Sequence, residues 1–260
     1  MATVSAFRPA ATTEVMSERE MRIQLAACYR LVAHFGMDDL VYTHISARVP
    51  GRHDHFLINP YGMMFHEVRA SDLVKIDLDG NLVGDSAYGV NKAGFVIHSA
   101  VHMARPEVVC VLHTHTRAGI AVSCTKEGLL PLNQFALQLY GRIAYHDYEG
   151  VALDEDERSR LIADLGDKPA MILRNHGLLT AGRSIPEAFA LMYYLDQSCR
   201  IQVDTKALGG TIVLPAEAVQ QKTAKQFQGM GNSPQSTSMG QREWPALLRL
   251  CDKLDPSYKD

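Results

Sequence analysis

The sequence predicts an α/β domain, and three observations lead to this prediction. Its 260 residues suit one large domain. A hydrophobic fraction of 47% is enough to fill a sizeable core. Stretches with helical spacing of apolar residues alternate with short apolar runs that are typical of strands. We expect a flexible leader at 1–16, the domain at 17–210, and a tail at 211–260 whose short helices pack on the body or on a neighbouring subunit.

The first helix is predicted to begin at Ser17, because Ser17 and Glu20 have the spacing of a capping box. Apolar residues at helical spacing follow, and Gly36 is a suitable C-cap. Alternating or β-branched stretches then predict strands, the last closing in an Asp-Gly turn. These stretches are 40–51, 55–60 and 74–81.

The second half of the chain alternates helices with fully apolar strands. Apolar runs predict buried strands at 107–113 and 170–174. Pro186 is well placed in the first turn of a long helix that ends near Leu208. Further helices are predicted at 92–104, 116–123, 154–165, 215–228 and 244–254.

Composition excludes several classes of partner. The net charge is −3 and lysine and arginine form no cluster, so neither nucleic acid nor an anionic membrane surface is an expected partner. The five cysteines are widely spaced and form no C-x-x-C pair, which disfavours a disulfide framework or a cysteine zinc site. No signal peptide or run of about 18 apolar residues occurs, so we expect a cytoplasmic protein.

Two histidines close the strand predicted at 107–113. Residues two apart on a strand share a face, so His113 and His115 can bind one ion. His176 closes the next buried strand, and Gly177 after it permits a sharp backbone turn. Either motif alone also fits ordinary surface or structural histidines. Together they predict a three-histidine site for Zn²⁺, Mn²⁺, Fe²⁺ or Co²⁺, with open positions as in catalytic sites.

Other histidines are weaker candidates. His98 and His102 lie four apart on one face of the helix predicted at 92–104. Three roles remain open for His98: a fourth metal ligand, a residue that contacts the ligands from behind, or a residue packed in the core. His102 is expected to be structural. His44 lies in a loop that is a candidate substrate contact.

These residues resemble the class II aldolase/adducin family over about 17–208, and the THISARVPG stretch resembles its adducin-like branch. The most specific matches are His113 with His115, His176 with Gly177, and the segment 98–106. Two loops support the resemblance. They are Thr43-His44-Ile45-Ser46 with Arg48, and Asn59-Pro60-Tyr61-Gly62.

The resemblance implies a three-layer α/β/α fold around a mostly antiparallel sheet, as a homotetramer with active sites between subunits. It implies a divalent ion held by residues that match His113, His115 and His176. Zn²⁺ or Mn²⁺ is expected, and Fe²⁺ or Co²⁺ is the alternative. A small-molecule substrate would chelate the ion, which acts as a Lewis acid on a developing enolate. Members include aldolases, an epimerase, a dehydratase, decarboxylases and non-catalytic adducin.

One departure concerns the catalytic base. The sugar-phosphate aldolases of the family carry a glutamate four residues before the position of His98, where this chain has Gly94. Glycine cannot transfer protons, and it leaves room for a bulkier substrate. Decarboxylation needs an electron sink but no base that removes a carbon-bound proton. We therefore expect a metal-dependent carbon–carbon lyase, a decarboxylase or an aldolase, on a small hydroxy-aromatic or keto acid.

Roles follow for the remaining candidates. His98 or a metal-bound water is expected to protonate the product carbon. The candidate bases for aldol cleavage are a metal hydroxide, Tyr145 and a residue from another subunit. The candidate substrate contacts are His44, Ser46, Arg48, Asn59, Lys92, Gly94 and Arg174. Two alternatives stay open: an Fe(II)-dependent oxygenase on the same scaffold, and a non-catalytic adducin-like interaction module.

Overall fold

The computed structural model describes residues 16–90, 92–150, 155–230 and 239–260. The predicted leader lies almost wholly outside the described residues. The helices are α1 (Glu18–His34), α2 (Lys92–Ala104), α3 (Arg117–Ser123), α4 (Gln134–Gln138), α5 (Glu155–Leu165), α6 (Ile185–Ala207), α7 (Glu217–Met230), α8 (Trp244–Leu254) and the 3₁₀ helix η1 (Pro256–Lys259). The strands are β1 (His44–Arg48), β2 (Phe56–Ile58), β3 (Val74–Ile76), β4 (Cys110–Thr114), β5 (Ile143–His146), β6 (Ala170–Leu173) and β7 (Gly177–Gly182).

The strands form one sheet in the order β3-β2-β1-β4-β7-β6-β5. Every neighbouring pair is antiparallel except β5 and β6, which are parallel. The expected mostly antiparallel sheet is therefore confirmed. Its central pair, β4 and β7, carries or adjoins all three histidines of the predicted metal site.

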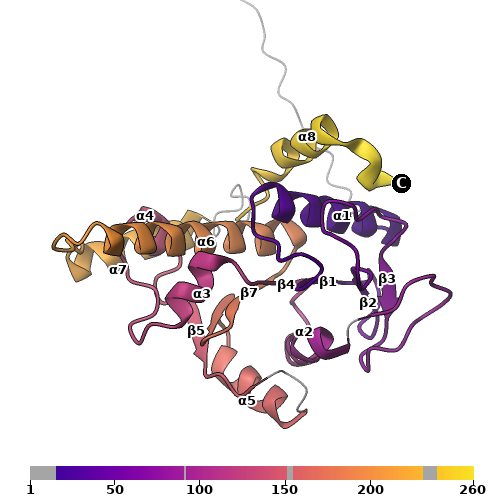
Figure 1. Ribbon diagram of the computed structural model, residues 1–260, viewed down its shortest axis with the longest axis horizontal. Helices are drawn as coiled ribbons and strands as arrows, with labels where there is room; N and C mark the ends of the chain where they lie inside the picture. Colours follow the sequence, from indigo (N-terminus) through magenta and orange to yellow (C-terminus); the bar gives the residue numbers. More distant parts are fainter. Residues whose placement is uncertain (1–15, 91, 151–154, 231–238) are drawn as a thin grey trace, which may run out of the picture.

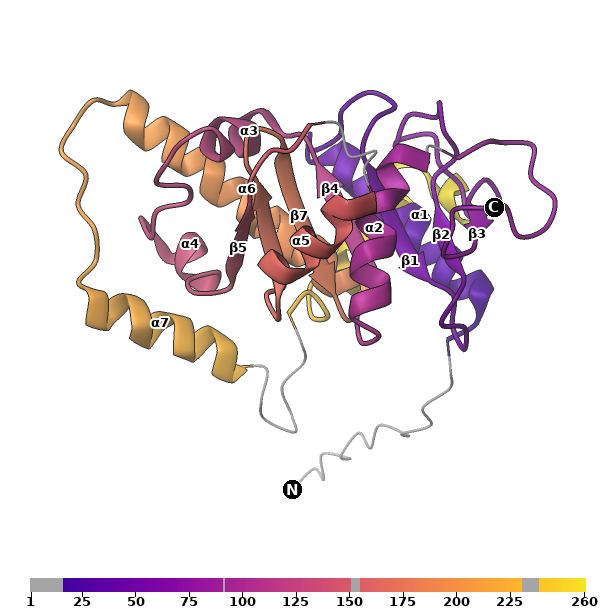
Figure 2. The same ribbon diagram turned by 90° about the horizontal axis from the view of Figure 1, so that it is seen from below.

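Helices cover both faces of this sheet (Figures 1 and 2). In Figure 1, α1 and α6 lie above the sheet and α8 lies on the outer side of α1, while α2 and α5 lie below it. The main core fills the α1 and α6 side, and a second cluster lies between the sheet and α2 with α5. All residues of β1, β4 and β7 are buried, because both faces of these strands are covered. The three-layer α/β/α fold is thus confirmed.

The capping box is present at the start of α1. The Ser17 hydroxyl accepts the Glu20 N–H at 3.2 Å, and the Glu20 carboxylate accepts the Ser17 N–H at 2.7 Å. The helix ends before Gly36, whose φ of 64° lies in the left-handed region that favours glycine. The loop from this glycine to β1 contains Asp39 and leads to His44, and both residues lie near the predicted metal site.

Most predicted elements are found, and the differences have local causes. The strand expected from 107 starts only at Cys110, because a turn closes with the Val108 N–H donating to the Arg105 carbonyl. The sequence reading missed α4, β5 and β7. In β7, Gly-Leu-Leu-Thr-Ala-Gly has glycines at both ends, so its strand signal is weak although the strand is central.

The segment after residue 210 contributes to the main core. Trp244 in α8 is 5% exposed and Tyr258 in η1 is 1% exposed, and both belong to the cluster that includes α1. Arg30 of α1 forms an ion pair with Asp255 at 3.0 Å. Helix α7 instead lies beside α4.

Two expectations from composition can be compared with the fold. All five cysteines are free thiols. No helix among the described residues combines the length and the hydrophobicity needed to cross a membrane.

One buried hydroxyl joins α1 to the sheet. Tyr29 of α1 is fully buried, and its oxygen accepts the backbone N–H groups of Ile45 in β1 at 2.9 Å and of Asn59 after β2 at 3.0 Å. These two N–H groups have no access to water. The position of β1, and of His44 at its start, therefore depends on this hydroxyl.

Replacing Tyr29 with Phe should lower the free energy of unfolding by about 1–3 kcal/mol, because two buried N–H groups lose their acceptor while the ring stays. Urea denaturation measures this change. The matched control is Tyr61→Phe, whose side chain is 51% exposed and should tolerate the change. Equal unfolding midpoints for Tyr29→Phe and wild type would contradict the role given to the hydroxyl.

Candidate metal site

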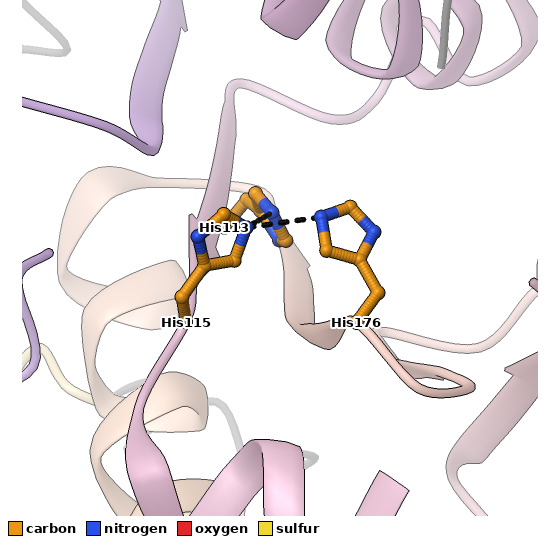
Figure 3. Close-up of side chains that lie close together, drawn as sticks. All are labelled: His113, His115 and His176. Atoms are coloured by element: carbon orange, nitrogen blue, oxygen red, sulfur yellow. Dashed lines mark hydrogen bonds between the residues drawn. The ribbon is translucent and has the colours of Figure 1, made fainter. Parts of the chain in front are cut away.

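Three imidazoles converge at one end of the β4–β7 pair (Figure 3). His113 belongs to β4, His115 follows the last residue of β4, and His176 lies in the turn between β6 and β7. The His115 Nε2 lies 2.9 Å from the Nε2 of His113 and 2.9 Å from that of His176. The three potential ligand atoms all lie within 4.8 Å of one another. The structure thus brings together the residues that the two sequence motifs predicted as ligands.

The backbone explains this convergence. Antiparallel pairing sets Thr114 of β4 opposite Leu178 of β7, so the β6–β7 turn lies beside the end of β4. Asn175 within the turn has a φ of 56°. A Cβ on Gly177 would collide with the Thr114 carbonyl oxygen, and it would press on the rings of two of the histidines. The expected reason for this glycine was therefore wrong: Asn175 takes the left-handed conformation, and Gly177 is needed for close approach.

Hydrogen bonds fix two of the rings. The His113 Nδ1 lies 2.9 Å from the Leu178 carbonyl oxygen, and the His115 Nδ1 lies 3.0 Å from Oδ2 of Asp39. A carbonyl or a carboxylate can only accept, so each Nδ1 carries the proton of the neutral ring. Each Nε2 then presents a lone pair. This is the tautomer of a histidine that binds a metal through Nε2.

Two lone pairs that face each other at 2.9 Å repel unless a cation lies between them. Burial also keeps His113 and His176 neutral. It lowers the pKa of His176 to about 4, with a further contribution from His115, and it holds the pKa of His113 well below its ordinary value. Neutral imidazole is the form that binds metal. The donor set therefore fits a divalent ion held by three nitrogens, with positions left open.

His44 lies beside this triad, and His98 lies next to His44. His44 stands opposite His113 in the β1–β4 register, and its ring centroid lies 5.7 Å from that of His98. Burial, and next the neighbouring His115, lowers the pKa of His44 to about 4. Both side chains are buried, at 7% and 0% exposure. They stay candidates for contact with a substrate or for proton transfer.

A buried polar chain lies behind them. The Ser46 hydroxyl is 2.8 Å from Nδ1 of His98 and 2.9 Å from Nε2 of His102. The His98 Nε2 is buried without a hydrogen-bond partner among the described residues. His98 is not part of the converging group, which disfavours the fourth-ligand alternative. Its predicted role as a proton donor remains a prediction.

Three predicted substrate contacts are directed elsewhere, because their polar groups are already bonded inside the fold. Ser46 is fully buried between the two helix histidines. Arg48 is 8% exposed, donates to three backbone carbonyls and lies at the end of β1 opposite to His44. Asn59 is 4% exposed, and its side-chain oxygen accepts from the Tyr29 hydroxyl. The expectation that these residues meet a substrate needs correction.

Tyr145 and Arg174 are also placed away from the triad. Tyr145 lies on β5, which β6 and β7 separate from β4. Its hydroxyl accepts the Leu129 N–H at 3.0 Å. The Arg174 guanidinium lies over the Tyr145 ring at 4.3 Å and donates to the Thr125 carbonyl. Both side chains therefore hold the loop after α3, and the proposed base and anion contact are not found at the triad.

Lys92 and Gly94 occupy the first turn of α2. Only the backbone of this turn is described, so the placement of the Lys92 side chain lies outside what the structure describes. Their assignment as substrate contacts stays a prediction.

Two residues near the triad were missed by the sequence reading. Asp39 contacts His115 across 76 positions of the chain, and it follows another aspartate in a loop, so no pattern marked it. Tyr148 is 54% exposed, and its ring centroid lies 6.4 Å from that of His176. Tyr148 follows β5, and no motif in the sequence marked it.

The fold and the site together define a three-layer α/β protein with a histidine triad of the kind that binds catalytic metals. Residues 23–203 match the family described as the class II aldolase and adducin N-terminal domain. The chain therefore belongs to the class II aldolase/adducin family.

Relatives come from two branches. A Pseudomonas aeruginosa protein, provisionally named as a class 2 aldolase, is 51% identical over 94% of this chain and 93% of its own length. The alpha-adducin of Rattus norvegicus is 43% identical over 91% of this chain, but the match spans only 34% of that longer protein.

Solved structures have the same fold. The crystal structure of an aldolase II superfamily protein from Pseudomonas syringae has a TM-score of 0.88 and 48% identity, covering 96% of this chain and 98% of that chain. The L-fuculose 1-phosphate aldolase from Glaciozyma antarctica has a TM-score of 0.82 and 30% identity, covering 97% of each chain.

The buried histidines predict acid sensitivity of the metal-free protein. Burial lowers the pKa of His102 to about 3 and that of His98 well below its ordinary value. The unfolded chain takes up these protons near pH 6.5, so stability should fall as the pH drops from about 6.5 toward 3. Each histidine contributes at most about 1.4 kcal/mol per pH unit.

Urea denaturation across this pH range, with a chelator present, measures the slope. His102→Gln should reduce the slope of the unfolding free energy against pH by the contribution of one histidine, at most about 1.4 kcal/mol per pH unit. His66→Gln is the control, because His66 is exposed in the fold. A slope unchanged by His102→Gln would contradict the assignment of a neutral buried His102.

Proposed function

We propose that this protein is a divalent-metal-dependent carbon–carbon lyase that acts on a small hydroxy-aromatic or keto acid. The observation that carries the proposal is the convergence of three Nε2 atoms, two of them with the proton fixed on Nδ1. Such a cluster is unfavourable without a cation and leaves one side open. A similarity of 30% identity to an L-fuculose 1-phosphate aldolase adds support for lyase chemistry.

In this proposal His113, His115 and His176 hold the ion, with Zn²⁺ or Mn²⁺ favoured over Fe²⁺ or Co²⁺. When bound, the ion supplies a Lewis acid for negative charge that develops on substrate oxygen. The Leu178 carbonyl and the Asp39 carboxylate keep two rings oriented. His44, buried opposite His113, closes the β1 side of the site against water.

Decarboxylation is the favoured reaction. At Gly94, four residues before His98, a glycine stands where the resemblance places the glutamate of the sugar-phosphate aldolases. Loss of CO₂ leaves electrons on carbon and needs only a proton donor. Two residues are candidates for that proton. The Nε2 of His98 is buried and has no hydrogen-bond partner among the described residues, and Tyr148 is an exposed residue whose ring centroid lies 6.4 Å from that of His176. Aldol cleavage is the second reaction to test.

The carboxylate of such a substrate requires a cationic partner. Among the described side chains, no hydrogen bond, ion pair or ring contact joins a lysine or arginine to the triad. The candidates Arg48 and Arg174 are bonded elsewhere. We infer that the cation comes from Lys92 or from a neighbouring subunit, which agrees with a homotetramer that has sites between subunits.

A non-catalytic interaction module is the second candidate. The observation that favours it is the 43% identity to alpha-adducin over 91% of this chain. The two candidates differ in what they require of the triad. The proposed lyase needs an ion bound to the three histidines, whereas an interaction module does not.

Metal analysis of the purified protein should find close to one divalent ion per chain, and His113→Ala should lose it, because two nitrogens bind far more weakly than three. Inductively coupled plasma mass spectrometry measures the metal. The matched control is His66→Ala, an exposed histidine outside the triad, which should keep the ion. A wild-type protein that takes up no Zn²⁺, Mn²⁺, Fe²⁺ or Co²⁺ after reconstitution would favour the adducin-like module.

Activity is tested by incubating the loaded protein with hydroxy-aromatic and keto acids and measuring release of CO₂ or of an aldehyde. His115→Ala should abolish turnover while circular dichroism remains that of wild type. Retained turnover in metal-free His115→Ala would overturn the metal dependence of the proposed reaction, and no release of CO₂ or aldehyde by the loaded wild type from any of these acids would overturn the lyase proposal. Bound iron, together with oxygen consumption, would instead identify the oxygenase.

A further inference from the structure

Asp39 has no place in the sequence motifs, yet it contacts the triad directly. Its Oδ2 lies 3.0 Å from Nδ1 of His115, and the two side chains are 39% and 24% exposed. Among the described residues, it is the one carboxylate that an ion pair joins to any of the three histidines. Its side chain therefore brings the nearest negative charge to the site.

The three rings differ in what holds them. His113 belongs to β4, and a backbone carbonyl of the neighbouring strand, that of Leu178, accepts its Nδ1 proton. Sheet pairing thus fixes this ring whatever the side chains around it. His115 lies one residue beyond the end of β4 and has no such carbonyl. Its orientation depends on a single side chain, that of Asp39.

The loop that carries Asp39 is strained. Leu40 and Thr43 have φ values of 50° and 66°, in the left-handed region that side chains other than glycine rarely adopt. The Tyr42 N–H donates to the Asp39 carbonyl at 2.8 Å and closes the turn. Such conformations are unfavourable for residues other than glycine and persist where the surroundings enforce them.

Packing does not account for this turn. Leu40 is 62% exposed and Tyr42 is 48% exposed, so the apolar side chains at its tip gain little from it. The buried hydroxyl of Thr43 has no hydrogen-bond partner among the described residues. What the turn does achieve is the contact between Asp39 and His115, immediately before the chain enters β1.

We propose that Asp39 is a positioning residue that fixes the Nδ1–H tautomer and the ring orientation of His115, and thereby sets the affinity of the triad for a divalent ion. The second half of this statement rests on the proposed function. A carboxylate that accepts from a ligand histidine also makes the ligating nitrogen more basic, and losing such a partner weakens metal binding about 10–100-fold.

The first test is Zn²⁺ affinity, measured by competition with a chromogenic chelator. Asp39→Ala should raise the Kd for Zn²⁺ about 10–100-fold. Asp39→Asn should fall between Ala and wild type, because its amide oxygen accepts the same hydrogen bond without the charge. The matched control is Asp38→Asn, which removes the same charge next to Asp39 and should keep the wild-type Kd. A wild-type Kd for Asp39→Ala would overturn the effect on affinity.

The second test needs no metal. In the metal-free protein with ¹⁵N-labelled histidine, the imidazole spectrum of His115 should report the Nδ1–H tautomer, and Asp39→Ala should convert it to a mixture. An unchanged spectrum would overturn the positioning role. If the wild type binds no Zn²⁺, the proposed function fails, while the tautomer result still decides whether Asp39 orients His115.

Discussion

The antiparallel pairing of β4 with β7 is the constraint on which the site depends. Their register sets Thr114 opposite Leu178, which places the turn between β6 and β7 against the end of β4. The contact is close enough that a Cβ at Gly177 would not fit. His113, His115 and His176 meet because two backbones meet, and the helices on both faces of the sheet keep those backbones buried and fixed.

Burial then decides the chemistry of the triad. Desolvation lowers the pKa of His176 to about 4 and that of His113 well below its ordinary value, so these two rings remain neutral. Neutral rings with the proton held on Nδ1 direct their lone pairs at one another, an arrangement that a cation stabilises. The same desolvation keeps His44 and His98 neutral beside the site. The proposed metal binding and the expected sensitivity to acid thus both depend on the burial of neutral histidines.

Membership of the class II aldolase/adducin family leaves the reaction open, because the family's fold supports more than one role. Gly94 separates this chain from the aldolase pattern with a catalytic glutamate, while the complete triad provides the donor set that a metal-dependent enzyme would require. Arg48 and Arg174, the obvious cations for an acidic substrate, are used inside the fold. The choice between reactions therefore depends on groups around the open face of the triad.

Most of the helices, most of the strands and the three converging histidines could be predicted from the sequence, because caps, periodicity and the His-x-His spacing are local signals. It did not reveal β7, whose glycines hide a central strand. It also assigned Ser46, Arg48 and Tyr145 to the site, since a polar side chain gives no sign in sequence of the partner it will find. Asp39 became visible only in the tertiary structure, because its contact with His115 joins residues 76 positions apart. Which polar groups are already satisfied, and which face the site, is decided by packing across the whole chain.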